Sequence, residues 1–196
     1  MEPYQSVFKR KEVKYLLTEA QLASLRPALE AHMEPDAFAH SSISNFYYDT
    51  PDYRMIRRSL EKPSYKEKLR LRSYGVPNDQ TPVFPEIKKK AQGIVYKRRV
   101  SMHYGDALRY LSRRQPGGNG QIFQELNWML ISYGSLAPRI FLSYERDSWK
   151  GQEDPTLRLT LDREILWRTE ALDLRRGAWG TPLLKPGQVL MEIKIS

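Results

Sequence analysis

The sequence predicts an α+β fold in which an antiparallel β-sheet closes into a barrel around a charged lumen, with helices packed outside. The main observation is that six segments carry charged residues at alternate positions, with apolar residues between them. These segments are 8–15, 66–72, 86–90, 144–146, 157–162 and 192–194. Because strand side chains alternate between two faces, each segment has one charged and one apolar face. Small barrels usually fill their interior with side chains, so a charged interior implies an anionic occupant.

The composition narrows the classes of partner and chemistry. The chain has 196 residues and a net charge of +9, which points to anionic partners such as phosphorylated molecules, nucleic acid or an acidic membrane surface. The sequence contains no cysteine, which excludes disulfides, thiol catalysis and cysteine-type zinc sites. It shows no secretory leader and no apolar run long enough to span a bilayer. We therefore expect a soluble, cytoplasmic protein.

The first half of the chain is predicted to be rich in strands. Thr18 and Gln21 form a capping-box pattern at the start of a helix that ends near His32, with Pro27 expected to kink it or delay its start. Pro51 follows a turn and predicts a second helix, 52–60. The expected strands are 7–17, 43–48, 65–74, 83–90 and 95–102, of which the third and fourth form a hairpin.

The second half begins with helices and returns to strands. Two amphipathic helices, 105–114 and 122–133, flank a glycine-rich loop and should lie against the outside of the sheet. The strands expected after them are 139–149, 156–161, 164–169, 171–175 and 189–195. The chain contains no internal repeat or linker, so residues 1–196 are expected to form one domain.

The basic residues suit a phosphate chain. Arg70 and Arg72 share one face of a strand, and Lys88 and Lys90 share a face of its expected partner. Arginine binds phosphate oxygens in bidentate fashion, and lysine adds point charges. For a single strand, an exposed basic face is the simpler interpretation. The leucines on the opposite faces need burial, however, and if they pack outward the charges point into the barrel.

The carboxylates on these strands have two interpretations. Glu12, Glu86, Asp162 and Glu192 each lie an even number of positions from a cation on the same strand, so that strand alternation puts both on one face. They could form ion pairs that reduce repulsion within the basic face. Alternatively, they could bind Mg²⁺ or Mn²⁺, which usually take only one or two protein carboxylates beside phosphate oxygens. Glu192 is the best candidate for a metal ligand.

The sequence gives no support for covalent catalysis or for other nucleotide-binding motifs. The three histidines, His32, His40 and His103, have no flanking motif and are interpreted as ordinary surface or packing residues. A phosphate-binding loop of the P-loop or Rossmann kind is missing, as is an aromatic stripe typical of RNA recognition.

Taken in order, the motifs resemble those of the triphosphate tunnel metalloenzymes, and among these the VTC-type polyphosphate polymerase domain. The resemblance covers nearly the whole chain. The residues that carry it are Phe8–Tyr15, Tyr47–Tyr53, Lys68–Gly75, Glu86–Lys90, Lys97–Arg99, Tyr144–Arg146, Leu157–Asp162 and Met191–Lys194. Each motif alone is weak, but their order and spacing together are specific.

The resemblance implies a barrel-shaped tunnel whose basic residues hold a triphosphate or polyphosphate. The residues expected to act on the transferred phosphoryl group are Arg70, Arg72, Lys88, Arg146 and Arg158. Further phosphate-binding candidates are Lys14, Lys90, Lys97, Tyr144, Lys194, Arg10 and Arg57. The metal candidates, for Mn²⁺ or Mg²⁺, are Glu192, followed by Glu86 and Glu12.

The implied reaction is transfer of the γ-phosphoryl group of ATP to a polyphosphate chain. The alternatives are an inorganic triphosphatase or nucleotide-triphosphate hydrolase of the same fold, and a non-catalytic polyanion-binding or nucleic-acid-binding module. No specific nucleic acid is expected as a partner, because a recognisable nucleic-acid motif is missing. The sequence departs from the family pattern twice. Pro85 predicts a sheet edge or bulge, and the family's C-terminal helix is expected to be missing.

Overall fold

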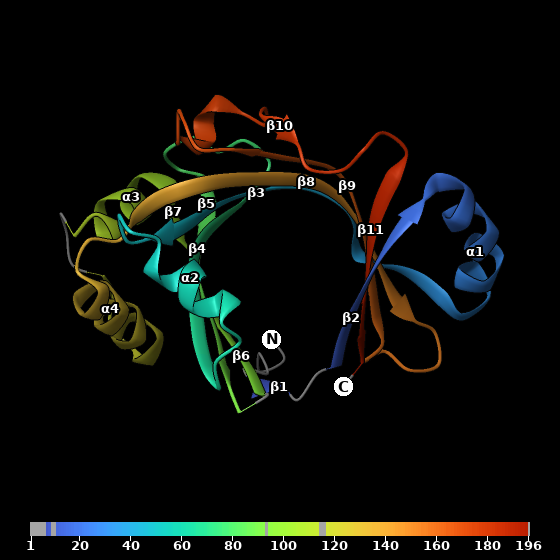
Figure 1. Cartoon of the computed structure of the whole chain (residues 1–196), viewed down its shortest axis with the longest axis horizontal. Coiled ribbons are helices and arrows are strands. Elements are labelled where there is room, and N and C mark those ends of the chain that lie inside the picture. The colour runs from blue at the N-terminus through green and yellow to red at the C-terminus, as the bar shows by residue number, and fades with distance from the viewer. Residues whose placement is uncertain (1–6, 9–10, 93, 114–116, 196) are drawn as a thin grey trace.

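The chain folds into an eleven-stranded antiparallel sheet that curls into an arch (Figure 1). The computed structural model describes residues 7–8, 11–92, 94–113 and 117–195. In sheet order the strands are β1 (Val7–Phe8), β6 (Ile94–Arg99), β5 (Pro82–Ala91), β4 (Tyr65–Tyr74), β3 (Met33–Asp49), β8 (Ala137–Gly151), β9 (Arg158–Arg168), β11 (Gln188–Ile195) and β2 (Lys11–Thr18). Two short strands lie beside this path, β7 (Met102–His103) on β5 and β10 (Thr181–Pro182) on β9.

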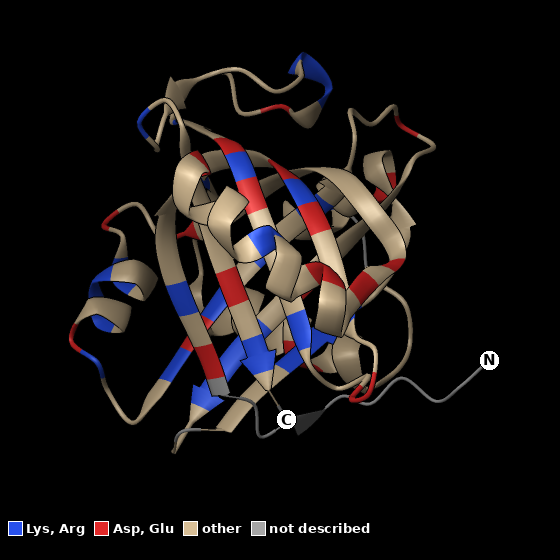
Figure 2. Ribbon diagram, turned by 90° about the vertical axis from the view of Figure 1, so that its right-hand side faces the viewer, with Lys and Arg blue, Asp and Glu red and all other residues tan. Residues whose placement is uncertain are grey.

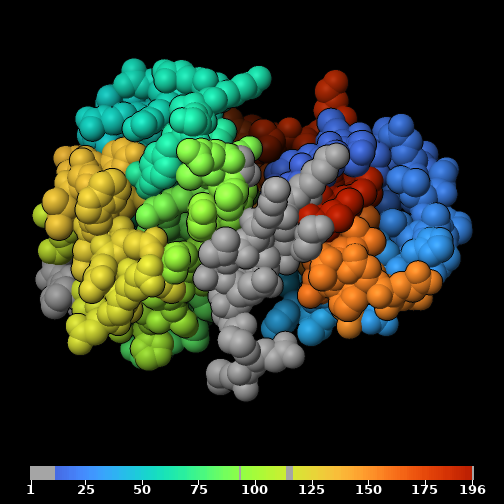
Figure 3. Space-filling model, turned by 90° about the horizontal axis from the view of Figure 1, so that it is seen from below, coloured from blue at the N-terminus to red at the C-terminus, as the bar shows by residue number. Residues whose placement is uncertain are grey.

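The curl brings the two ends of the sheet together without a continuous ladder. β1 pairs with β6 and β2 pairs with β11, so the first and last strands of the sheet are consecutive in the chain. Nζ of Lys88 on β5 lies 3.6 Å from Oε2 of Glu12 on β2, across this seam. Figure 3 shows the β5–β6 half (green) facing the β2 and β11 half (blue and red). The described part of the sheet is therefore strongly curled and tunnel-like, but it is not the closed barrel that the sequence predicted.

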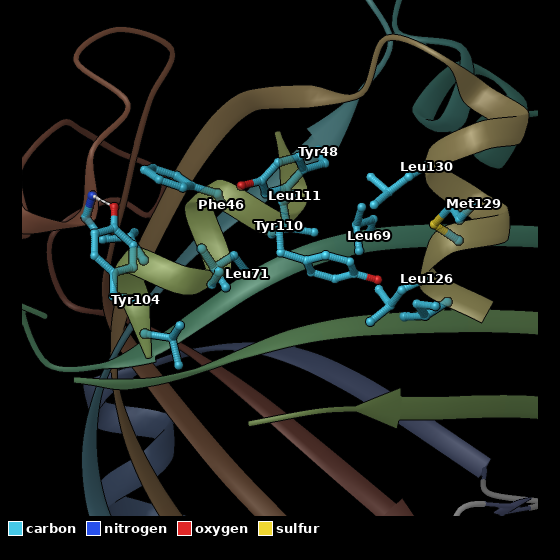
Figure 4. Packing of buried hydrophobic residues seen from close by; sticks show 14 of the residues in the cluster. Phe46, Tyr48, Leu69, Leu71, Tyr104, Tyr110, Leu111, Leu126, Met129 and Leu130 are labelled. Atoms are coloured by element: carbon cyan, nitrogen blue, oxygen red, sulfur yellow. Dashed lines mark hydrogen bonds between the residues drawn. The ribbon is translucent and has the colours of Figure 1, made fainter. Parts of the chain in front are cut away.

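Helices cover the outer face of the sheet, as expected. The helices α2 (Arg54–Leu60), α3 (Tyr104–Leu111) and α4 (Gln121–Tyr133) lie on one side of the arch, and α1 (Glu19–His32) lies on the other (Figure 1). Figure 4 shows the larger core, in which Leu69 and Leu71 of β4 are buried with Leu126 and Met129 of α4. A second core joins Leu22 of α1 to β9 and β11. Since the apolar faces of the strands pack outward, their charged faces line the inside.

Local sequence explains how the helices start. Thr18 Oγ1 accepts a hydrogen bond from the Gln21 amide at 3.2 Å, and Gln21 Oε1 accepts from the Thr18 amide at 2.9 Å, which confirms the capping box. The helix then runs through Pro27 as one element, without the later start considered above. The helix α2 begins two residues later than predicted, and the Asp49 carboxylate accepts hydrogen bonds from its first turn. Within the described residues, none of the helices has the length and apolar character needed to cross a membrane.

Four of the predicted strands differ from the strands of the structure. β3 begins at Met33 instead of residue 43, because its first half pairs with β8 and its own sequence does not alternate. The predicted strands 156–161 and 164–169 are one strand, β9, in which Glu164 has a φ of 49° beside an irregularity in the pairing with β8. The predicted strand 171–175 is wrong: Asp173 caps a short 3₁₀-helix, η1 (Leu174–Arg176).

Pro85 lies in the interior of the sheet, in a strand with neighbours on both sides. β5 pairs with β4 in unbroken register through Pro85. On its other side, β6 ends at Arg99 and β7 begins at Met102, so the partner strand is interrupted opposite the proline. The carbonyl of Pro85 accepts from the Val100 amide, and the side of the chain that lacks an N–H therefore faces this interruption. The sheet accommodates the proline because the neighbouring strand is interrupted between β6 and β7.

Candidate functional site: the charged lumen

The inner face of the arch carries charged side chains from seven strands. Their orientation follows from strand alternation, because the residues between them are buried in the two outer cores. Figure 2 shows basic and acidic residues interspersed along the strands. The charged residues that strand register places on the inner face include Glu12, Lys14, Lys66, Lys68, Arg70, Arg72, Glu86, Lys88, Lys90, Lys97, Arg99, Arg146, Lys150, Arg158, Asp162, Glu192 and Lys194. Cations therefore outnumber carboxylates on this inner surface.

Glu86 anchors the cations of β4 and β6. It is 1% exposed, pairs with Nε of Arg70 and lies 3.3 Å from Nζ of Lys97. Burial alone would raise the pKa of Glu86, but the charges of Arg70, Arg72 and Lys97 outweigh it and lower the pKa to about 2. Burial also lowers the pKa of Lys97 to about 8, with the neighbouring arginines acting in the same direction. Glu86 is therefore an ionised counter-charge that fixes two cations in the lumen.

Arg72 is held differently, by neutral partners. Its Nε donates to Oδ1 of Asn45 and its Nη2 donates to the hydroxyl of Tyr144, both at 3.0 Å. The residue is 5% exposed, and among the described residues no carboxylate lies within ion-pair distance of its guanidinium group. A buried arginine without a paired charge is costly unless an anion joins it. Arg72 is therefore a buried cation with neutral hydrogen-bond partners, and Glu86 is a carboxylate whose charge it influences from a greater distance.

Arg146 lies two strands away from Arg72, on β8. Its Nε and Nη2 donate to the two carboxylate oxygens of Asp162 at 2.6 and 2.7 Å, in a bidentate pair. Its guanidinium also stacks 4.9 Å from the centre of the Tyr144 ring and lies 4.0 Å from Oε2 of Glu192. Asp162 thus orients Arg146 and leaves Tyr144 between two arginines.

Glu192 and Glu12 form the acidic part of the lumen. Burial would raise the pKa of Glu192, but its hydrogen bond with Glu12 and three neighbouring cations lower it to about 2. Oε1 of Glu192 lies 3.3 Å from Nζ of Lys194, and Oε1 of Glu12 lies 3.7 Å from Nζ of Lys14. Two adjacent carboxylates offer the hard oxygen donors that Mg²⁺ and Mn²⁺ prefer. They fit a metal that completes its shell with phosphate oxygens, because within the described chain no group of three His, Asp or Glu side chains could hold a metal alone.

Most of the predicted site residues converge on this surface. Arg158 lies at one end of it, where Nη1 is 3.4 Å from Oδ2 of Asp36. Arg57 does not converge: it lies on α2 outside the sheet and pairs with Asp52 at 2.8 Å. Arg10 lies outside the described residues. Glu86 faces the lumen, but its carboxylate is already paired with the side chains of Arg70 and Lys97. Glu192 and Glu12 are therefore the remaining metal candidates.

Sequence reasoning missed several residues of the lumen. Lys68 faces inward on the same strand as Arg70 and Arg72, and burial together with neighbouring lysines lowers its pKa. Tyr47, opposite Arg70, is half-buried; desolvation would raise its pKa, but nearby cations, Arg70 first, lower it. The two-residue spacing to Arg70 could have identified Lys68. Asn45 carries no comparable signal, because its role depends on Arg72 in a neighbouring strand.

Comparison with solved structures defines the class. The chain superposes on a Bacillus halodurans protein named as a candidate adenylate cyclase with a TM-score of 0.58 and 15% identity, covering 96% of this chain and 83% of the other. A Vibrio parahaemolyticus protein that is also named as a candidate adenylate cyclase superposes with a TM-score of 0.54 and 14% identity. The match covers 98% of this chain and 78% of the other. The fold is therefore the triphosphate tunnel fold.

The particular family follows from the sequence. The model of the VTC domain family matches residues 9–196, and the chain belongs to that family. No curated protein matches the chain in sequence.

Proposed function

We propose that this protein is a metal-dependent polyphosphate polymerase that transfers the γ-phosphoryl group of ATP to a polyphosphate chain inside the lumen. Membership of the VTC domain family and the tunnel fold support an activity on triphosphate or polyphosphate. The observation that carries the proposal is the inward convergence of cations from both halves of the arch, with buried Arg72 held only by neutral partners. An oxyanion with several charges would compensate this arrangement.

In the proposed reaction, a terminal oxygen of the acceptor chain attacks the γ-phosphorus of ATP. The bond from the γ-phosphorus to the bridging oxygen breaks, ADP leaves with that oxygen, and the chain gains one phosphate unit. Arg70, Arg72 and Arg146 hold the phosphate oxygens and stabilise charge in the transition state, and Lys88 and Arg158 add positive charge along the chain. The protein supplies position and charge, without a covalent intermediate on a side chain.

Glu192 and Glu12 would hold the divalent ion. When bound, Mn²⁺ or Mg²⁺ would neutralise charge on the phosphate oxygens. Lys14 and Lys194 lie beside these carboxylates and compensate their charge in the free protein. The same two lysines remain available to phosphate once the carboxylates face a cation.

The test is incubation of the protein with ATP and Mn²⁺ or Mg²⁺, followed by gel analysis of polyphosphate and quantification of ADP. Growth of polyphosphate in proportion to ADP is expected for the wild type and for Lys89→Ala, whose side chain faces outward to Glu125. Loss of growth is expected for Arg72→Ala, with an unchanged circular dichroism spectrum. Orthophosphate release from ATP or tripolyphosphate without chain growth would assign hydrolysis instead. A protein that binds neither compound would refute an activity on triphosphates.

A further inference from the structure

A pocket of about 300 Å³ lies on the outer side of the sheet, between α3, the last residues of β3 and the first residues of β8. Tyr48 of β3 is in register with Pro138 of β8, and both border the pocket. The preceding residue, Tyr47, faces the lumen and accepts a hydrogen bond from Arg70, so strand alternation turns Tyr48 away from the lumen. The pocket is therefore separate from the charged site. Its lining residues are Tyr48, Leu108, Arg109, Leu111, Ser112, Leu136, Ala137 and Pro138.

The walls of the pocket are mostly apolar. Leu108 and Leu111 form the side supplied by α3, and Leu111 is 1% exposed. Figure 4 shows Leu111 beside the ring of Tyr48. Residues 136–138, around the start of β8, form the facing wall. Small-molecule sites are concave and mostly apolar with a few polar groups, and about 300 Å³ is at the lower end of their size range. The shape and lining therefore suit a small apolar ligand.

The hydroxyl of Tyr48 adds a polar group to this apolar pocket. Tyr48 is 5% exposed, and among the described residues its hydroxyl makes no hydrogen bond. Two other buried tyrosines of the same core do make one, because Tyr104 donates to Asp173 at 3.1 Å and Tyr110 donates to Asn127 at 2.8 Å. Burial raises the pKa of Tyr48, and nearby Tyr104 acts in the same direction, so the hydroxyl stays neutral. A buried tyrosine hydroxyl usually has a partner, and that of Tyr48 can donate to a ligand.

The polar residues at the rim of the pocket already have partners. Nη2 of Arg109 donates to Oδ1 of Asp106 at 2.6 Å, and Oγ of Ser112 donates to the carbonyl of Arg109 at 3.1 Å. Arg109 is the charged residue among those that line the pocket. An anionic ligand would have to compete with Asp106 for its guanidinium group. The pocket therefore favours an uncharged ligand that is oriented by Tyr48.

We propose that this pocket binds a small uncharged molecule that has an apolar body and a hydrogen-bond acceptor, such as a carbonyl oxygen. The apolar body packs against Leu108 and Leu111, and the acceptor takes the hydrogen bond that the Tyr48 hydroxyl donates. At about 30 Å³ for each water-sized group, the pocket holds about ten non-hydrogen atoms. Because the site lies outside the lumen, it does not depend on the proposed function.

Two probes of similar shape test the site by NMR titration of the isotope-labelled protein. Acetophenone carries a carbonyl oxygen on an apolar body, and α-methylstyrene has a methylene group in place of that oxygen. Both should shift the amide signals of Leu108, Leu111 and Ala137 in a saturable way. Tyr48→Phe should bind acetophenone about five- to tenfold more weakly, because one hydrogen bond is lost, and should bind α-methylstyrene as the wild type does. The control Tyr53→Phe, at a tyrosine that is 46% exposed, should match the wild type with both probes.

The proposal is overturned if neither probe gives saturable shifts at these amides, or if Tyr48→Phe binds acetophenone as tightly as the wild type. A second variant, Ala137→Phe, fills the pocket from the β8 side and should abolish the shifts with an unchanged circular dichroism spectrum. Shifts that persist in this variant would place the probes elsewhere. Without ligand, the melting temperature of Tyr48→Phe should equal or exceed that of the wild type, because the hydroxyl removed has no partner among the described residues. A lower value would contradict the unpartnered hydroxyl on which the site depends.

Discussion

Lys97 shows how the lumen changes the chemistry of a single side chain. Burial and the charges of Arg72 and Arg70 lower its pKa to about 8, while Glu86, 3.3 Å away, acts in the opposite direction. A bound phosphate chain would add negative charge beside the ammonium group and raise its pKa toward the ordinary value of about 10.4. Ligand binding and proton binding at Lys97 should therefore be linked.

The expected result is proton uptake when tripolyphosphate binds between about pH 8 and pH 10, where free Lys97 is deprotonated and bound Lys97 is protonated. Affinity should fall as the pH rises through this range. Calorimetry in buffers of different ionisation enthalpy measures the uptake, which should be larger for the wild type than for Lys97→Met. The outward-facing variant Lys89→Met should match the wild type. Equal uptake in the Lys97 variant would assign the effect to another group.

Arg168 is a buried arginine outside the lumen, and its contacts are structural. It stacks between the rings of Phe141 and Trp179, at 3.5 and 4.5 Å from their centres, and donates to the carbonyls of Gly177 and Trp179. The variant Arg168→Met should lower the free energy of unfolding by about 1–3 kcal/mol, because these carbonyls lose their donor. Urea denaturation measures the loss.

Exposed Arg175, which pairs with Asp173 and Asp79, provides the control for Arg168. Its replacement by methionine should change the free energy of unfolding by less than about 1 kcal/mol. If Arg168→Met is equally mild, the hydrogen bonds to the carbonyls contribute no net stability.

At the level of single residues, spacing predicted which side chains face inward but not what they touch. Arg70 and Arg72 share a face as expected, and alternation alone was sufficient for that. Their partners, Glu86 and Asn45, come from different neighbouring strands and depend on register. Arg57 was a poor prediction of a lumen residue, because a basic helix next to a basic strand can lie on either side of a sheet.

At the level of elements, the two faces of β4 are expected to have different roles, because successive side chains point to opposite faces of a strand: the outer face stabilises the fold and the inner face binds ligand. Leu69 is fully buried under the helices, whereas its neighbour Lys68 faces the lumen without a paired carboxylate among the described residues. We expect Leu69→Ala to lower the free energy of unfolding by about 2–5 kcal/mol. Lys68→Ala should change it by less than about 0.5 kcal/mol and should weaken tripolyphosphate binding. Chemical denaturation and calorimetry on both variants test the pair, and a reversed pattern would mean that the faces are assigned wrongly.

Elements with strong local signals could be predicted, and elements defined by distant partners could not. The capping box of α1 and the alternation of β4 lie within a few residues of sequence. The first half of β3 is a strand because β8 pairs with it about 110 residues later in the chain. The segment that follows β9 was mistaken for a strand because the capping of η1 by Asp173 outweighs a short apolar pattern.

For the whole molecule, lumen cations belong to both halves of the arch. Arg70 and Lys97 lie on the β4–β6 half, whereas Arg146 and Lys194 lie on the β8–β11 half. A ligand that contacts both halves should stabilise the fold, by about 2.7 kcal/mol at a concentration one hundred times Kd. Tripolyphosphate should therefore raise Tm in a thermal shift assay, by less as salt increases. Arg72→Ala should show a smaller shift, and an equal shift would place the ligand elsewhere.

The strand pattern predicted a sheet around a charged lumen, and the resemblance of the motifs implied the triphosphate tunnel fold, but the predicted closure of the barrel was wrong. Alternating charge indicates which face turns inward, and the buried leucines required helices on the other face. Whether the last strands meet depends on how much the sheet twists and curls, which no short segment of sequence specifies. The net charge of +9 likewise did not exclude nucleic acid as a partner, whereas the strand register of the structure places many of the cations on the inner face.

The pairing of β2 with β11 has a consequence for how the protein reaches its native state. Residues 11–18 are synthesised long before their partner, 188–195, because the register joins Thr18 to Gln188 and Lys11 to Ile195. Contacts between such distant segments form slowly because a very long loop must close. In pulse-labelled hydrogen exchange during refolding, the amides of these two strands should become protected after those of the β4–β5 hairpin. The wall of the channel would then be completed only after the rest of the sheet has formed, and early protection of β2 would contradict this order.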